Sequence, residues 1–257
     1  MSTGPPIVYF HGMPGSPREL ALFGGAGMVG QPTGRVFAPD RTAGGCGSSA
    51  GLDALAADIA ARYPNGDIHL IAFSLGTRVA LEVAVRLGPL VGAIDLVSPA
   101  APLETGDYAG VAGAPVFALA ARSPRLFALF VDAQSIAARR VPALLYRGLF
   151  ASAGGTDRAL AARPAFAATM RMVLTDCLAP GAAGYRAELR AFAAPWAPLL
   201  ARIGQPITLW HGAADTWAPS GMTEALHARL PNVVAVHRFD GLGHYATLEV
   251  ALRALCR

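Results

Sequence analysis

Short apolar runs alternate with segments of helical spacing along most of the chain, and this alternation limits the folds that the chain can adopt. The runs are rich in β-branched or aromatic residues and are bounded by Gly, Pro or Asp, which is typical of buried strands. They cover residues 7–10, 35–38, 68–73, 91–97, 206–210 and 233–239. Strands that alternate with helices predict an α/β fold, with a mostly parallel sheet of about six strands flanked by helices.

Two of the segments between these runs carry clear helix signals. Residues 52–62 (LDALAADIAAR) have helical spacing, and residues 75–87 have it again. In the second segment Val79 and Val83 share one face, and Gly88 with the proline after it would end the helix. Both segments are therefore predicted to be helices that pack on the sheet.

The alternation stops after the fourth apolar run. Residues 101–196 contain no convincing strand, whereas helix starts such as Ser123-Pro124 and periodic apolar stretches recur. We predict a core formed by residues 1–100 and 197–257, with residues 101–196 inserted as a helical cap. Such a cap would lie above the carboxyl ends of the strands, where ligands bind in open α/β sheets.

Within the predicted cap, the stretch "ASAGGTD" at residues 151–157 is rich in small residues. Glycine and serine clusters between periodic segments are typical of loops. This stretch is predicted to be a mobile connection between two cap helices.

Composition narrows the class of protein further. A chain of 257 residues can bury a sizeable core. Arginines interrupt the apolar stretches too often for a membrane span, and the N-terminus lacks the features of a signal peptide, so a cytoplasmic location is expected. All 21 basic residues are arginine and are distributed along the chain, which is typical of a solvated surface and predicts no nucleic-acid partner.

The three cysteines, Cys46, Cys177 and Cys256, are odd in number and far apart. They have neither metal-ligand spacing nor the pattern of a disulfide framework, which agrees with a reducing compartment. No metal and no cofactor is expected.

Ser74 ends the third apolar run, and Gly76 follows two residues later at the start of a helical segment. This strand, turn and helix are what a nucleophile elbow needs, because the tight turn exposes the serine hydroxyl above the sheet. The usual pattern is G-x-S-x-G, whereas this chain has Ala72 in the first position. A serine that only caps the helix would give the same local pattern, so both interpretations stay open on this stretch alone.

Two later loops supply an acid and a base. Asp215 lies in "HGAADTWAP", just past the run at 206–210, and His244 lies in "DGLGHYATLE", just past the last run. The chain order serine, acid, histidine, each after a strand, is typical of a fold class whose three loops converge above the sheet. There His244 would take the proton of Ser74, and Asp215 would hold the imidazole tautomer.

A fourth loop, "YFHGMPGSP" at residues 9–17, follows the first run. A glycine-rich turn leaves backbone N–H groups unpaired, and we predict that the amides of Met13 and Leu75 form an oxyanion hole. A plain tight turn would also explain the glycines. His11 is predicted to brace this turn, and Arg41 to be solvated or to form a structural ion pair.

These motifs resemble those of the α/β-hydrolase family. "HGMPGS" is similar to the family's oxyanion loop, and "APDRTAGGCGSS" is similar to the segment after its next strand. "AFSLG", "HGAADTWAP" and "GLGHY" resemble the nucleophile, acid and histidine loops in order. The resemblance covers most of residues 6–100 and 203–257, and "GYRAELRAFAAPW" at 184–196 is similar to the end of a helical cap.

The resemblance implies a catalytic triad of Ser74, Asp215 and His244, with the oxyanion held by the Met13 and Leu75 amides. Two features depart from the family pattern. One is Ala72, and the other is that the "HG" strand begins almost at Met1, where relatives carry a β-hairpin. An exposed sheet edge would then need self-association or a shielding N-terminal segment, so both a monomer and a homodimer stay open.

Phe73, Ser98 and Trp217 are candidate residues of the substrate pocket. A mostly apolar cap favours small or medium hydrophobic substrates over sugars, nucleotides or polymers. We therefore predict a serine hydrolase that cleaves a carboxylic ester of a small molecule through an acyl-enzyme on Ser74. Alternatives with the same triad are a C–C bond, thioester or amide hydrolase or a perhydrolase, and a different class is a non-catalytic ligand-binding protein.

Overall fold

In the computed structural model, which describes residues 4–23, 35–43 and 45–256, the chain forms a six-stranded sheet. The strands are β1 (Ile7–Phe10), β2 (Val36–Phe37), β3 (Ile68–Phe73), β4 (Val91–Val97), β5 (Ile207–Gly212) and β6 (Val233–Phe239). Their order is β2-β1-β3-β4-β5-β6, and every neighbouring pair is parallel. The predicted α/β fold with a six-stranded, mostly parallel sheet is confirmed.

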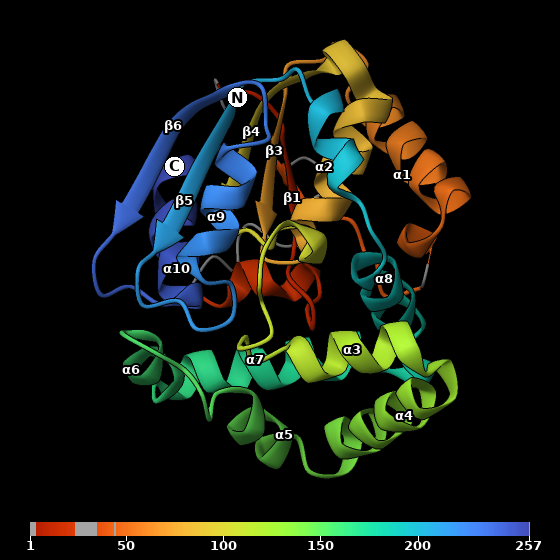
Figure 1. Ribbon diagram of the computed structural model, residues 1–257, viewed down its shortest axis with the longest axis vertical. Coiled ribbons are helices and arrows are strands. Elements are labelled where there is room, and N and C mark those ends of the chain that lie inside the picture. The colour runs from red at the N-terminus through yellow and green to blue at the C-terminus, as the bar shows by residue number, and fades with distance from the viewer. Residues whose placement is uncertain (1–3, 24–34, 44, 257) are drawn as a thin grey trace.

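Helices cover both faces of the sheet, as parallel strands require (Figure 1). The helices of the core are α1 (Ser49–Arg62), α2 (Gly76–Leu87), α9 (Ser220–His227) and α10 (His244–Leu255). Because side chains alternate along a strand, Ala72 belongs to the apolar cluster that contains residues of α1, α2 and α9, whereas the next residue, Phe73, belongs to the cluster that contains residues of α10. Each face of the sheet thus has its own apolar core.

The first helix starts a few residues before its predicted position. The hydroxyl of Ser48 accepts a hydrogen bond from the Gly51 amide at 3.2 Å, which satisfies one of the free N–H groups of the first turn. The helix therefore begins at Ser49 rather than at residue 52. The apolar spacing that predicted this helix starts only where the helix meets the core.

Six α-helices lie between β4 and β5, and they form a layer at the carboxyl ends of the strands (Figure 1). They are α3 (Ala114–Arg122), α4 (Pro124–Arg140), α5 (Pro142–Leu149), α6 (Asp157–Ala161), α7 (Pro164–Cys177) and α8 (Ala183–Ala193). This confirms a helical insertion between two strands of the sheet. None of the helices in the described residues combines the length and the apolar character of a transmembrane span.

A buried ionic contact joins the insertion to the core. The Arg41 guanidinium donates hydrogen bonds to the Glu188 carboxylate on α8 and to the His11 carbonyl oxygen, and all three side chains are buried. Burial and the neighbouring Arg41 charge hold the pKa of His11 well below its usual range, so this histidine is neutral. Arg41 therefore forms a structural ion pair that links the core to the insertion.

The edge strand β2 has only two residues, which gives another chain little backbone to pair with. Residues 1–3, on which the expectation of a shielding N-terminal segment partly rests, lie outside the described residues.

Candidate active site

Ser74 occupies a sharp turn between β3 and α2. Its φ of 55° lies in the left-handed region, which is rare for residues other than glycine and is typical of functional turns. The turn is held by a hydrogen bond from the Ser74 amide to the Val97 carbonyl oxygen at 3.1 Å. At Gly76 a Cβ atom would lie 2.5 Å from the Phe10 carbonyl oxygen, so the third position of the motif requires glycine.

Ala72, the departure from the family pattern, is fully buried in the apolar cluster on the α2 side of the sheet. It pairs in register with Phe10 and Leu96, within regular strand structure. The methyl group is accommodated there, and Ser74 still has the positive φ that an elbow needs.

His244 and Asp215 form a buried pair beside Ser74. The Nδ1 atom of His244 lies 2.6 Å from Oδ2 of Asp215. The other carboxylate oxygen, Oδ1, accepts hydrogen bonds from the amides of Trp217 and Ala218, each at 2.9 Å. Burial alone would raise the pKa of Asp215, but the His244 charge and these hydrogen bonds outweigh it and lower the pKa. Asp215 is therefore ionised near neutral pH.

Aromatic rings hold the imidazole of His244 from two directions. The Phe73 ring centroid lies 4.5 Å from that of His244, and the Trp217 ring lies edge-on at 5.2 Å. The hydroxyl of Ser98, at the end of β4, donates to the His244 carbonyl oxygen at 3.2 Å. Ser98 is fully buried and is not among the residues that line the cavity, so the structure places this predicted pocket residue behind the histidine.

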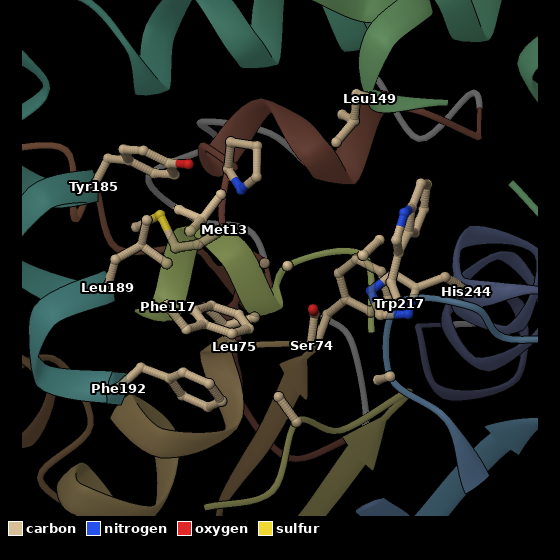
Figure 2. Close-up of a pocket in the computed structure, with 18 of the residues that line it drawn as sticks. Met13, Ser74, Leu75, Phe117, Leu149, Tyr185, Leu189, Phe192, Trp217 and His244 are labelled. Carbon is tan, nitrogen blue, oxygen red and sulfur yellow. The ribbon is translucent and has the colours of Figure 1, made fainter. Parts of the chain in front are cut away.

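The Ser74 hydroxyl points into a cavity of about 270 Å³ between the sheet and the insertion (Figure 2). Phe73, Trp217 and His244 also line the cavity, and Asp215 lies behind His244. Apolar side chains from the insertion and α9 form much of the wall: Val116, Phe117, Leu149, Leu189, Phe192 and Met222. Among the described lining residues none is Arg, Asp or Glu.

Met13 and Leu75 carry the two amides that are predicted to form an oxyanion hole. Both residues line the cavity next to Ser74, and neither amide donates a hydrogen bond to any part of the chain that the structure describes. Leu75 is also the N-cap residue of α2, where the helix dipole favours negative charge. Across the described ranges, no three His, Cys, Asp or Glu side chains converge as a metal site.

Glu19 is a buried residue of this region that the sequence did not reveal. Its Oε1 atom accepts hydrogen bonds from the Gly12 amide at 3.0 Å and from the Tyr9 hydroxyl, so it holds the loop that carries Met13. Burial raises the pKa of Glu19 to about 7, against the lowering effect of these hydrogen bonds. In sequence, a glutamate after Ser-Pro-Arg resembles a solvated residue of a first helical turn, so only its burial identifies it.

We expect Glu19→Gln to stabilise the protein at alkaline pH. The folded carboxyl keeps its proton up to about pH 7, whereas the unfolded one loses it near 4.5, so wild-type stability falls as pH rises between these values. A neutral amide removes this loss, which amounts to roughly 3 kcal/mol above pH 7. Urea unfolding of both proteins at about pH 5 and pH 8 should show nearly equal stability at the lower pH and a more stable variant at the higher. Equal stability at both would contradict it.

The fold and the cavity define a class: an α/β protein with a parallel sheet and a cavity between the strand ends and a helical insertion. The chain belongs to the α/β-hydrolase fold family, whose model matches residues 5–250. This confirms the resemblance seen in the sequence motifs. No curated protein matches the chain by sequence.

Several solved structures share this fold. The chain is similar to a bromoperoxidase from Bacillus anthracis, with a TM-score of 0.66 and 15% identity, over 99% of this chain and 91% of that one. It is also similar to a thermophilic esterase from Thermogutta terrifontis, with a TM-score of 0.65, 18% identity and coverage of 99% and 88%. An enol-lactonase from Burkholderia xenovorans LB400 gives 0.63 and 15%, over 98% and 89%. At these identities the likeness concerns the fold alone.

Proposed function

We propose that this protein is a serine hydrolase that cleaves small or medium, hydrophobic carboxylic esters through a covalent acyl-enzyme on Ser74. The observation that carries the proposal is the convergence of Ser74, His244 and Asp215, which come from the ends of three different strands. Ser74 and His244 share one cavity, and Asp215 binds the far nitrogen of His244. A nucleophile, a base and a group that orients the base are what covalent acyl transfer needs.

In the proposed cycle, Ser74 Oγ attacks the ester carbonyl carbon while Nε2 of His244 takes the hydroxyl proton. The amides of Met13 and Leu75 donate to the developing oxyanion, and each such donor is worth about 3–4 kcal/mol of transition-state stabilisation. His244 then passes the proton to the departing alcohol. Water attacks the acyl-enzyme with His244 as base, which releases the carboxylic acid and restores the Ser74 hydroxyl.

The wall of the cavity supports an uncharged, mainly apolar substrate. Aliphatic and aromatic side chains dominate the lining, and no side chain of the described lining except His244 could form an ion pair with a carboxylate or phosphate of the substrate. A buried charge without a partner costs several kcal/mol. Selection in this cavity therefore depends on burial of the apolar acyl or alcohol group.

A panel of p-nitrophenyl esters, from acetate through butanoate, hexanoate and octanoate to decanoate, tests the proposal. We expect kcat/KM to rise about threefold to fourfold for each added methylene until the cavity is filled, because each buried methylene contributes about 0.8 kcal/mol. The rate should then fall for longer chains. Turnover no faster than that of Ser74→Ala on every ester would contradict the proposal and favour a non-catalytic ligand-binding protein.

A further inference from the structure

The stretch at residues 151–157, predicted to be a mobile connection, packs on the two loops that carry Asp215 and His244. The amide of Thr156 donates to the Gly241 carbonyl oxygen at 3.2 Å, and a Cβ atom on Gly154 would lie 2.6 Å from the Ala214 carbonyl oxygen. Asp157, at the end of the stretch, is only 1% exposed. This part of the insertion is thus in direct contact with the candidate active site.

Asp157 caps the N-terminus of the helix that begins at His244. The helix α10 begins at His244, and its N-cap residue is Gly243, which has no side chain to accept the free N–H groups of the first turn. The Asp157 carboxylate accepts both of the relevant amides: Tyr245 N–H at 3.1 Å through Oδ2, and Ala246 N–H at 2.8 Å through Oδ1. Asp157 precedes Tyr245 by 88 residues, so the cap comes from the insertion.

We propose that Asp157 is a positioning residue for His244, through which the helical insertion holds the catalytic base in place. This inference rests on the proposed function. The side chain of His244 is fixed by Asp215, but the start of its helix is fixed by a carboxylate on α6. Movement of α6 away from the core would leave two amides without acceptors beside the base. The position of the insertion thereby determines whether His244 is placed to act as the catalytic base.

Gly243 permits a test in which the capping group is moved from Asp157 to the N-cap position of α10 itself. A Cβ atom there would lie 2.5 Å from Cγ of Asp157, so no side chain fits while the aspartate is present. In Asp157→Ala that space opens, and the extended φ and ψ of Gly243, −91° and −164°, suit a capping serine. The double variant Asp157→Ala/Gly243→Ser therefore supplies the missing acceptor from within α10.

For Asp157→Ala we expect kcat on p-nitrophenyl butanoate to fall about tenfold with KM within about threefold of wild type, because small displacements of a catalytic group lower the rate steeply. The double variant should recover most of this loss. The matched control is Asp132→Ala, which removes an ion pair with Arg186 within the insertion and should leave kcat unchanged. An unchanged kcat in Asp157→Ala, or a double variant no better than the single one, would overturn the proposal.

A second readout needs no turnover. The proton between His244 Nδ1 and Asp215 should give a downfield NMR signal in wild type, weaken through exchange in Asp157→Ala and return in the double variant. A signal that is identical in all three proteins would overturn the role of Asp157 even if no ester is hydrolysed. Ester inactivity of the wild type combined with the predicted signals would instead contradict only the proposed function.

A different observation concerns the outer face of α4. Phe127 and Val131 on this helix are buried, yet on the opposite side Leu126, Leu129 and Ile136 are 57%, 65% and 56% exposed. Leu144 on the adjoining α5 is 64% exposed. Both helices lie at the end of the molecule farthest from the sheet (Figure 1). A helix that is apolar on both sides needs cover on both sides.

The same region carries the positive charge of the protein. Residues 101–196 contain ten arginines and six acidic residues, which equals the formal net charge of +4 of the whole chain. Five exposed arginines belong to α3, α4 and α5, and within the described part of the chain none of them is in an ion pair: Arg122, Arg125, Arg139, Arg140 and Arg147. Asp132, the one acidic residue of α3, α4 and α5, is paired with Arg186.

We further infer that this apolar and basic face, formed by the outer sides of α4 and α5, binds the surface of an anionic lipid bilayer. Leucines among arginines match the boundary between acyl chains and anionic headgroups. A second copy of the chain fits less well, because a two-fold contact would bring the arginines of both copies together. Nucleic acid would pair with the arginines but leave the leucines in water.

Co-sedimentation with vesicles tests this inference. We expect binding to vesicles that contain phosphatidylglycerol to exceed binding to pure phosphatidylcholine at least about tenfold, and to weaken as salt rises. The triple variant Leu126→Ser/Leu129→Ser/Leu144→Ser should lose most of the binding, whereas Val234→Ser, on the exposed face of β6, should not. Equal binding to both vesicles, no binding, or a dimer that the triple variant abolishes would each overturn it.

Discussion

Ser74→Ala is expected to lower ester hydrolysis by about 10⁴–10⁶-fold, the loss typical for removal of the nucleophile from such a triad. In the proposed mechanism His244 deprotonates the Ser74 hydroxyl, which lines the cavity, and alanine leaves the rest of the cavity intact. Initial rates on p-nitrophenyl butanoate measure the loss. Far-ultraviolet circular dichroism should show an unchanged fold, because alanine can occupy the same turn.

A fluorophosphonate probe separates Ser74 from other serines. The probe should label the wild-type protein at Ser74, as mapped by peptide mass spectrometry, and should not label Ser74→Ala. The matched control is Ser152→Ala, because Ser152 also lines the cavity but its hydroxyl has no hydrogen bond to His244 or Asp215 among the described residues. Label on Ser152, or on Ser74→Ala, would contradict the assignment of the nucleophile.

Asp215→Asn is expected to lower kcat by about 10⁴-fold at nearly unchanged stability. In the native protein Oδ1 of Asp215 accepts two backbone N–H groups, from Trp217 and Ala218, so the amide oxygen of asparagine must take that place. Its NH₂ group then faces Nδ1 of His244, which must become the acceptor. The proton of the neutral imidazole moves to Nε2, and the ring can no longer take the proton of Ser74.

The pH dependence distinguishes this tautomer effect from a general loss of structure. Asp215→Asn should keep its fold by circular dichroism and should regain part of its rate at high pH, where hydroxide can take the serine proton. A kcat within about tenfold of wild type would show that Asp215 does not set the tautomer. If Asp215→Asn and Asp215→Ala lost their folded structure to the same extent, Asp215 would have a structural role only.

Much of the fold follows from short-range patterns in the sequence. Each apolar run predicts a strand because buried parallel strands need side chains that are apolar on both faces, and the six runs correspond to β1 through β6. The position of the insertion follows from the loss of this pattern after β4. The start of α1 was less clear, because a capping contact and not the apolar spacing sets it.

The sequence by itself determined which residues form the strands and which form the three motif loops that follow them. A turn after a strand is a local property of the chain. Ser74, Asp215 and His244 could each be named as the polar residue at such a turn. Only the tertiary structure decided what surrounds them. Ser98 lies behind His244 and outside the cavity wall, although its position after a strand matched that of a pocket residue.

Likewise, only the tertiary structure showed which acidic residues are buried. Glu19, Asp157 and Glu188 lie in stretches that are typical of solvated loops or helix faces, yet each is buried against partners. Asp157 and Glu188 meet groups far away in the chain, the amides that follow His244 and the Arg41 guanidinium. A charged side chain carries no local sign of burial, because the energy that favours burial comes from a partner that only the fold brings near.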